Sequence, residues 1–249
     1  MIRLEGVTKS FASHEVLHPL DLCVEDGETL AVIGGSGSGK STLLRLIIGL
    51  IRPTSGRIWI DDAEISQMTE TELDRVRLRM GMVFQYSALF DSMTVGENVA
   101  FGLREHKRLK ETEIMRIVRE KLHLVGLDGS ERMMPGELSG GMKKRVSLAR
   151  AIAIDPSIIL YDEPSSGLDP LTSAKIDDLI IETQRKLGVT SVVVTHDMAS
   201  ACRIADRIAM LHKGSLIALD TVEEFRKLED PRVRAFFRAV ETEEKEAGL

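Results

Sequence analysis

The sequence predicts an α/β protein: a mixed sheet core with an antiparallel β part and an inserted helical region. Three observations predict it. A glycine-rich run at residues 34–42 lies between a strand pattern and a helical pattern. Elsewhere, apolar segments of strand length alternate with helical segments, and parallel strands need such crossover connections. Residues 86–153 carry helical patterns almost throughout and interrupt that alternation.

Elements in the first part of the chain follow from local apolar patterns and turn residues. Ala12-Ser13 and Asp61-Asp62 are expected turns, and Pro53 limits the first helical pattern. The expected elements are strands at residues 2–7, 16–24, 29–33 and 57–60 and a helix at residues 40–50.

Two capping boxes mark helix starts in the middle of the chain, because paired Thr and Glu side chains satisfy the first backbone N–H groups of a helix. They are Thr69-x-x-Glu72 and Thr94-x-x-Glu97. Residues 111–125 repeat apolar side chains at helical spacing and predict an amphipathic helix. The other expected elements are a short helix after Thr69, a strand at residues 82–84 and helices at residues 95–103 and 143–153.

Strand and helix patterns alternate again in the last part of the chain, with Lys213-Gly214 as a hairpin turn. Asp230-Pro231 starts a final helix, whose apolar stripe either packs on its own domain or contacts another subunit; its members are Val233, Phe236, Phe237 and Val240. Residues 241–249 are acidic and expected to be mobile. The expected elements are strands at residues 158–161, 191–195, 207–211 and 215–219 and helices at residues 170–187 and 198–204.

Composition limits the function classes. Among 249 residues, 43% are hydrophobic and the formal net charge is -6, so no global positive field attracts nucleic acid or anionic lipid. The local basic run Lys143-Lys144-Arg145 is expected to be a solvated face. No apolar stretch reaches membrane-spanning length, and the N-terminus lacks a signal-peptide core. Two cysteines form no disulfide framework. We therefore expect a cytoplasmic protein that reaches a membrane only through a partner.

The glycine-rich run has the pattern G-x-x-x-x-G-K-[ST] in the required setting, after a strand and before a helix. Its glycines turn backbone N–H groups onto one anion, and the helix N-terminus adds partial positive charge. Lys40 would reach the β- and γ-phosphates, and the Ser41 hydroxyl would hold Mg²⁺. The run predicts binding of a nucleoside triphosphate through Gly34, Gly35, Ser36, Gly37, Ser38, Gly39, Lys40, Ser41 and Thr42.

Two further motifs complete this chemistry. The strand at residues 158–161 ends in Asp162, a candidate Mg²⁺ ligand, and Glu163, a candidate acceptor for a proton of the attacking water. Alone, two such acids would most often form a solvated turn. Leu138-Ser139-Gly140-Gly141-Met142 is a second glycine-bearing helix start, or simply a Ser-capped helix. One chain therefore has two glycine-bearing helix starts that could bind phosphate. This suggests that two copies face each other head to tail, so that each nucleotide site uses one helix start from each copy.

Together these motifs resemble the nucleotide-binding subunit of ABC transporters. The resemblance extends from Ile2 to about Leu228, and Leu-Ser-Gly-Gly is its most specific part. Met142 departs from the family, which usually has Gln; backbone groups and Ser139 would still bind phosphate. The resemblance rests on residues 34–42, Gln85, residues 138–142, residues 158–163, residues 166–169 and His196.

The resemblance implies ATP and Mg²⁺ as ligands and assigns roles. Gln85 would reach Mg²⁺ or the attacking water, and His196 would sense the γ-phosphate. Asp169 would couple two sites across a subunit boundary, or merely cap the helix at Pro170. Phe11 would stack on adenine with Val16 nearby, or be a core residue. The implied catalytic residues are Lys40, Gln85, Glu163 and His196; the implied metal ligands are Ser41, Gln85 and Asp162; and Ser139, Gly140 and Gly141 would bind ATP held by the other copy.

The resemblance also implies a domain plan and partners. Residues 1–229 would form the ATPase domain, with its core at residues 1–85 and 154–229 and a helical subdomain at residues 86–153, followed by a C-terminal helix and tail at residues 230–249. The expected partners are a second copy, an integral membrane permease, an MCE or periplasmic lipid-binding subunit and a small cytoplasmic regulator, with no nucleic acid. The expected location is the inner face of the inner membrane.

The class of transported substrate is implied only by a closer resemblance to one group within this family. Residues 85–95, residues 103–106, the Met-ending signature and Asp230-Pro231-Arg232-Val233-Arg234 resemble the ATPases of MCE-linked phospholipid transporters. The apolar stretch at residues 86–95 would dock a permease helix, or be buried in the helical region. Amino-acid or other solute importers are the alternative, and a soluble ABC assembly ATPase is a third class.

Overall fold

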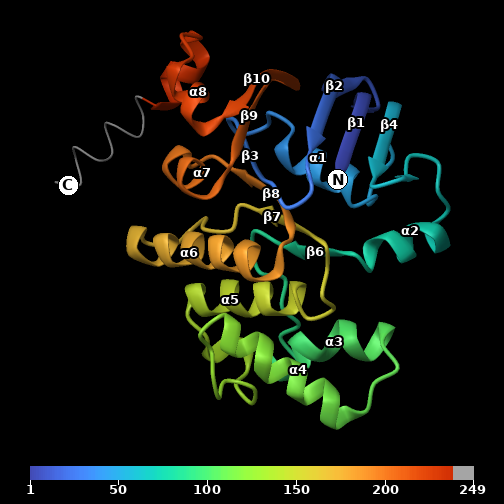
Figure 1. Ribbon diagram of the computed structural model, residues 1–249, viewed down its shortest axis with the longest axis vertical. Coiled ribbons are helices and arrows are strands. Elements are labelled where there is room, and N and C mark those ends of the chain that lie inside the picture. Colours follow the sequence, from blue (N-terminus) through green and yellow to red (C-terminus); the bar gives the residue numbers. More distant parts are fainter. Residues whose placement is uncertain (238–249) are drawn as a thin grey trace. The chain divides into compact units, whose positions relative to one another are not determined.

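The computed structural model describes residues 1–237, in which the chain folds into two compact units (Figure 1). The first comprises Met1–Met68 and Val192–Leu249, and the second comprises Thr69–Ser191. Val240 and the acidic tail at residues 241–249 lie outside the described residues, so expectations about them stay predictions.

The first unit contains an antiparallel sheet with strand order β2-β1-β4-β5. The first two strands, β1 and β2, form a long hairpin whose turn residue Ala12 has φ 52°. Their pairing extends beyond Val7, with Lys9 opposite Leu17. The expected strand end at Val7 was therefore too early, because the polar residues after it still pair across the hairpin. The strands are β1 (Ile2–Phe11), β2 (His14–Val24), β4 (Ser55–Ile60) and β5 (Ala63–Glu64).

The first unit also contains strands in the order β10-β9-β3-β8, with the unit boundary inside β8. β3 runs parallel to β9, whereas β9 and β10 form the expected hairpin, with Lys213 at φ 47° and Gly214 at φ 81°. Every residue of β3 is buried, as the apolar pattern predicts. The elements are β3 (Thr29–Ile33), β8 (Thr190–Thr195), β9 (Arg207–His212), β10 (Ser215–Thr221), α1 (Lys40–Ile47), α7 (Met198–Ile204) and α8 (Val222–Lys227).

The described part of the C-terminal stripe packs on its own unit. Residues 231–237 are helical, and Val233 is fully buried beside Phe225 and Met198. Phe236 and Phe237 pack against the same cluster. For these residues, the first of the two alternatives is confirmed.

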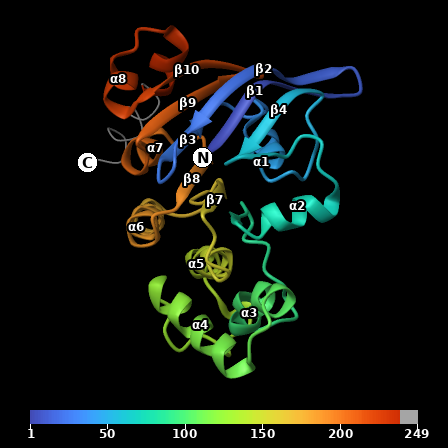
Figure 2. The ribbon, with the colours of Figure 1, turned by 45° about the vertical axis from the view of Figure 1, so that its right-hand side comes forward.

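The second unit pairs two parallel strands with the predicted helices (Figure 2). Both capping boxes form, at Thr69 and at Thr94. Helices α3, α4 and α5 pack on one another, and α5 also packs on α6 and β6. The elements are α2 (Glu70–Arg77), β6 (Met80–Val83), α3 (Val95–His106), α4 (Glu111–Leu124), the 3-10 helix η1 (Pro135–Glu137), α5 (Gly140–Ala151), β7 (Ile158–Asp162) and α6 (Pro170–Leu187).

Three short elements were not expected: β5, η1 and α8. The first two have no more than three residues, too few for a periodic pattern. Helix α8 did carry a signal, because Thr221 lies three residues before Glu224 and its hydroxyl accepts the Glu224 backbone N–H. Within residues 1–237, no helix combines the length and apolar character that crossing a bilayer requires.

Candidate active site

The glycine-rich run of the first unit forms a tight loop between β3 and α1. Gly34 has φ 156°, and a Cβ there would lie 2.3 Å from the carbonyl oxygen of Leu211. Gly39 has φ 107°, and its Cβ would lie 2.5 Å from Cδ2 of Leu17. Both positions therefore require glycine: at Gly34 the loop passes too close to the backbone of β9 for a side chain, and at Gly39 the positive φ would strain any residue with a Cβ.

Lys40 is the first residue of α1, and its side chain reaches back to the loop. It is buried, and its Nζ donates to the carbonyl oxygens of Gly34 at 2.7 Å and Gly35 at 3.3 Å. Residues 35–37 are exposed, whereas Ser38 is buried and its Oγ has no hydrogen-bond partner within the described residues. A cationic lysine, an unpaired hydroxyl and exposed loop backbone fit an anion such as a triphosphate.

His196 lies in the same unit, directly after β8, which neighbours β3 in the sheet. Its side chain is exposed, while the preceding strand is wholly buried. Asp197 then caps α7 by accepting the backbone N–H of Ser200 at 3.1 Å. Both His196 and the loop thus follow the carboxyl ends of neighbouring strands.

Phe11 is an exposed aromatic residue and not a core one. It ends β1, its side chain is 46% exposed, and Nζ of Lys9 lies 4.8 Å from the ring centroid. The core alternative is therefore wrong, and stacking on adenine stays a prediction. Val16 is half-buried, next to the Leu17 that packs against Gly39.

Asp162 and Glu163 lie at the carboxyl end of β7 in the second unit. The strand residues before them are buried, and burial raises the pKa of the Tyr161 hydroxyl. Asp162 and Glu163 are half-buried, as polar groups at a strand end can be. Glu163 adopts φ 48°, a left-handed backbone that is uncommon for a residue with a side chain.

Lys144 contacts the backbone of two predicted site residues. Its Nζ donates to the carbonyl oxygen of Gln85 and, at 3.2 Å, to that of Glu163. The side chain is buried, which corrects the expectation that residues 143–145 form a solvated face. Burial lowers the pKa of Lys144, and the carboxylates of Glu163 and Asp162 oppose that shift.

Sequence reasoning missed Lys144, although a signal was present. Positions 141, 144, 148 and 151 are spaced as one face of a helix, and all four residues are buried in α5. A lysine on that stripe has its head group on the packed side of the helix, where it needs acceptors.

The segment after Gln85 is held by side chains of the same unit. Ser87 and Ala88 have φ 62° and 47°, and Arg150 donates to their carbonyl oxygens at 2.9 and 2.6 Å. Tyr86 is 87% exposed and residues 88 and 90–92 are exposed too, so the alternative that the stretch at residues 86–95 is buried in the helical region is wrong for these residues, while Ser87 and Val95 are buried. The rings of Phe90 and Phe101, both exposed, lie 4.8 Å apart.

Ser139 and Asp169 each cap a helix of the second unit. The Ser139 hydroxyl accepts the Met142 N–H at 3.3 Å at the start of α5, leaving Ser139 and Gly140 exposed. The Asp169 carboxylate accepts the Thr172 N–H at 3.0 Å, and hydrogen bonds from Thr172 lower the pKa of Asp169. The capping role of each is confirmed, while action on a second copy stays a prediction.

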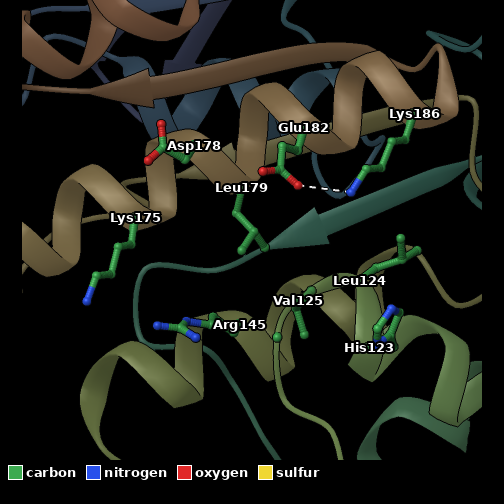
Figure 3. Close-up of a pocket in the computed structure, with 10 residues that line it drawn as sticks. His123, Leu124, Val125, Arg145, Lys175, Asp178, Leu179, Glu182 and Lys186 are labelled. Carbon is green, nitrogen blue, oxygen red and sulfur yellow. Dashed lines mark hydrogen bonds and ion pairs between the residues drawn. The ribbon is translucent and has the colours of Figure 1, made fainter.

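A separate cavity of about 370 Å³ lies in the second unit (Figure 3). It contains none of the predicted site residues, and Glu182 and Lys186 form an ion pair at 2.9 Å on its wall. The lining residues are His123, Leu124, Val125, Gly126, Arg145, Lys175, Asp178, Leu179, Glu182 and Lys186.

The candidate metal ligands Ser41, Gln85 and Asp162 supply a hydroxyl, an amide and a carboxylate. Oxygen donors of this kind suit Mg²⁺, which proteins usually hold through one or two carboxylates plus substrate phosphates. Within residues 1–237, no cluster of three or more His, Cys, Asp or Glu side chains is placed to hold a metal ion. The donor types therefore suit Mg²⁺ chemically, and coordination by these three residues stays a prediction.

Known proteins similar to this chain share one family. Residues 17–166 match the family described as ABC transporter. The probable ribonucleotide transport ATP-binding protein mkl of Mycobacterium leprae (strain TN) is 44% identical, over 94% of this chain and 68% of that protein. The methionine import ATP-binding protein MetN 2 of Rhodococcus jostii (strain RHA1) is 42% identical, over 96% of this chain and 72% of that protein. The chain thus spans about two thirds to three quarters of these relatives.

A third relative is matched over most of both chains. The intermembrane phospholipid transport system ATP-binding protein MlaF of Escherichia coli (strain K12) is 41% identical, over 96% of this chain and 89% of that protein. Among solved structures, the dimeric cassette MJ0796 bound to ADP and Pi has a TM-score of 0.82 at 34% identity, over 89% of this chain and 99% of that chain.

Proposed function

Because the chain belongs to the ABC transporter family, as an ATP-binding subunit that hydrolyses ATP, we propose that it powers a membrane permease for phospholipid transport in a bacterial envelope. The observation that carries the substrate class is the match to MlaF proteins, which extends over nearly the whole length of both chains. The Met142-ending signature supports the same assignment.

The first unit would hold the nucleotide. The loop at residues 34–42 would wrap the phosphates, with Lys40 moving its Nζ from the Gly34 carbonyl to the β- and γ-phosphates. The exposed ring of Phe11, beside Val16, would support adenine. His196 would contact the γ-phosphate, as its place after a strand neighbouring β3 suggests.

Hydrolysis would use residues from the second unit. The half-buried Glu163 carboxylate would accept a proton from the attacking water, and Gln85 would orient that water. Mg²⁺, held by Ser41, Gln85 and Asp162, would neutralise charge that develops on the phosphates. The left-handed backbone of Glu163 supports this role, since such conformations concentrate at functional sites.

Two copies would complete each site. The start of α5, where Ser139 and Gly140 are exposed and Gly141 is buried, would bind the γ-phosphate of ATP held by the other copy. Asp169 would then couple the two sites while it caps α6. The dimeric form of the similar cassette MJ0796 supports this arrangement. Removal of the γ-phosphate would take away the bridge, and the dimer would open.

The permease would dock on exposed aromatic side chains of the second unit, Tyr86, Phe90 and Phe101. Large apolar side chains exposed together are typical of interaction sites. The chain would therefore work at the inner face of the inner membrane. An MCE or periplasmic lipid-binding subunit and a small regulator would be further partners.

We retain residues 1–229 as the ATPase domain and residues 86–153 as its helical part, which contains all of α3, α4 and α5.

The test is to purify the chain with its membrane partners and identify the bound molecule by mass spectrometry. Phospholipid in a complex with an MCE-type subunit would support the proposal. The rival function is solute import, favoured by the similar identities of the mkl and MetN 2 relatives. A solute-binding protein in the complex, with no lipid, would establish that rival. Isolation without any membrane subunit would favour an assembly ATPase.

A further inference from the structure

Among the described residues of the second unit, left-handed backbone at residues other than glycine occurs at Asp155 and in two segments that are held by cations from α5. One is Glu163, and the other is Ser87-Ala88. Their carbonyl oxygens accept hydrogen bonds from Lys144 and Arg150, respectively. Such conformations persist only where surrounding contacts fix them. Helix α5 supplies those contacts.

Lys144 differs from Arg150 because it joins two distant parts of the chain. Its buried Nζ bonds the carbonyl of Gln85, at the carboxyl end of the β6 segment, and the carbonyl of Glu163, at the end of β7. These strands are parallel neighbours, so one ammonium group spans the ends of both. A charge-assisted hydrogen bond away from water is stronger and more directional than a neutral one.

We propose that Lys144 is a positioning residue for ATP hydrolysis, which fixes the backbone of Gln85 and Glu163 so that their side chains keep one geometry. The inference rests on the hydrolytic role proposed for Glu163. In this proposal Lys144 acts through the two carbonyl oxygens that it contacts. Its effect arises because a rotation of the peptide at φ 48° would redirect the Glu163 carboxylate.

The same helix connects this geometry to the second copy. Ser139 caps α5, and Lys144 lies just over one turn further along. A movement of α5 when Ser139 binds the other copy's nucleotide would therefore carry the Lys144 ammonium with it. The contact between Lys144 and Glu163 would then respond to closure of the composite site, which would link hydrolysis to dimer formation.

The experiment compares three substitutions of Lys144 in the 249-residue chain, assayed alone and with its membrane partners. Lys144→Met removes all donors at similar length, Lys144→Gln keeps a neutral donor, and Lys144→Arg keeps a cation with several donors. Steady-state ATPase assays give kcat and KM, titration with a fluorescent ATP analogue gives Kd, and thermal unfolding gives Tm. Lys143→Met, at the half-buried neighbour, is the matched control.

We expect Lys144→Met to lower kcat about 10- to 100-fold, the loss typical of a misplaced catalytic group. KM and the analogue Kd should stay within about 3-fold, because substrate binding does not depend on this contact. Lys144→Arg should recover most of kcat, Lys144→Gln should be intermediate, and Lys143→Met should match the wild type.

Three results would overturn the inference: wild-type kcat in Lys144→Met, equal losses in Lys144→Met and Lys144→Arg, or a joint fall of kcat, analogue binding and Tm. If Lys144→Met does not fold, the Arg and Gln variants decide by the same criteria. Glu163→Gln is assayed in parallel. Full activity there would remove the premise itself, whereas an inactive Glu163→Gln beside an active Lys144→Met would remove only the role of Lys144.

Discussion

The Nζ of Lys40 lies 2.7 Å from the carbonyl oxygen of Gly34, so the lysine at the start of α1 closes the loop that leads into its own helix. The bond shows that the ammonium group is already aimed into the loop, where phosphate oxygens would replace the carbonyl as acceptors. We therefore expect the loop to need little rearrangement to receive an anion.

From this geometry we predict that Lys40→Met weakens ATP binding about 10- to 100-fold, since a hydrogen bond to a charged group contributes about 1.5–3 kcal/mol. Titration with a fluorescent ATP analogue measures the change in Kd. Lys107→Met, at an exposed lysine after α3, is the control and should bind normally. An unchanged Kd in Lys40→Met would remove the lysine from the binding site.

Glu163→Gln tests the proposed base. The amide cannot accept the proton of the attacking water, so we expect turnover to fall about 10²- to 10⁴-fold. ATP binding should persist, and the variant should accumulate as an ATP-bound dimer in size-exclusion chromatography. Normal turnover would show that another group takes the proton.

Mixing two inactive variants tests whether each site is shared between copies. Ser139→Asp keeps a helix-capping side chain but places a carboxylate opposite the phosphates. In an equal mixture of Lys40→Met and Ser139→Asp, half of the dimers are mixed and each has one intact composite site, so roughly a quarter of wild-type activity should return. The control is a preparation in which every subunit carries both Lys40→Met and Ser139→Asp, so that no intact site can form. No recovery after verified subunit exchange would contradict the shared site.

Local signals explain what could be predicted from the sequence. A capping box needs four consecutive residues, and both boxes, at Thr69 and Thr94, form as predicted. The Lys213-Gly214 hairpin and the glycine loop are equally local. Each of these features depends on backbone chemistry that neighbouring residues determine.

Contacts between distant segments explain what could not be predicted. Lys144 lies 59 positions from Gln85 in the sequence, so its burial depends on how α5 packs against β6. The same holds for Arg150 and Ala88, 62 positions apart. Strand β1 extends past Val7 because β2 pairs with its polar end, a tertiary effect that overrides the local pattern.

The capping box of α3 gives a pH prediction. The backbone N–H of Thr94 and then its hydroxyl bond the Glu97 carboxylate, which holds the pKa of Glu97 below its usual 4.5. Because the folded-state pKa is depressed, this stabilisation is complete above the unfolded-state pKa and disappears as the pH falls through the folded-state value.

Glu97→Gln should therefore lower the free energy of unfolding at pH 7, and the difference from wild type should shrink as the pH falls below 4.5 and through the folded-state pKa of Glu97, until the carboxyl group is protonated in both states. Urea unfolding at a series of pH values measures it. Glu72→Gln, in the matching box of α2, should behave alike, and Glu105→Gln, at an exposed position of α3, should not. A difference that is constant with pH would contradict the electrostatic explanation.

Asn98 should be a main stabilising residue of the segment that carries the proposed permease contacts. The residue is fully buried, accepts the Phe90 N–H at 2.8 Å, and shares its amide hydrogens among the carbonyls of Phe90, Met93 and Thr94 at 3.0–3.1 Å. Asn98→Ala would leave these groups unsatisfied, at a cost of about 1–3 kcal/mol for a buried donor or acceptor.

We therefore expect Asn98→Ala to lower the free energy of unfolding by that amount, and to increase hydrogen exchange at Phe90 and its neighbours before exchange rises elsewhere. Asn98→Asp keeps the acceptor for the Phe90 N–H but loses both donors, so it separates the two halves of the interaction. With its permease present, the Ala variant should keep basal ATP hydrolysis while losing the permease-dependent part. If both variants unfold like wild type, Asn98 is not a main stabilising residue of this segment.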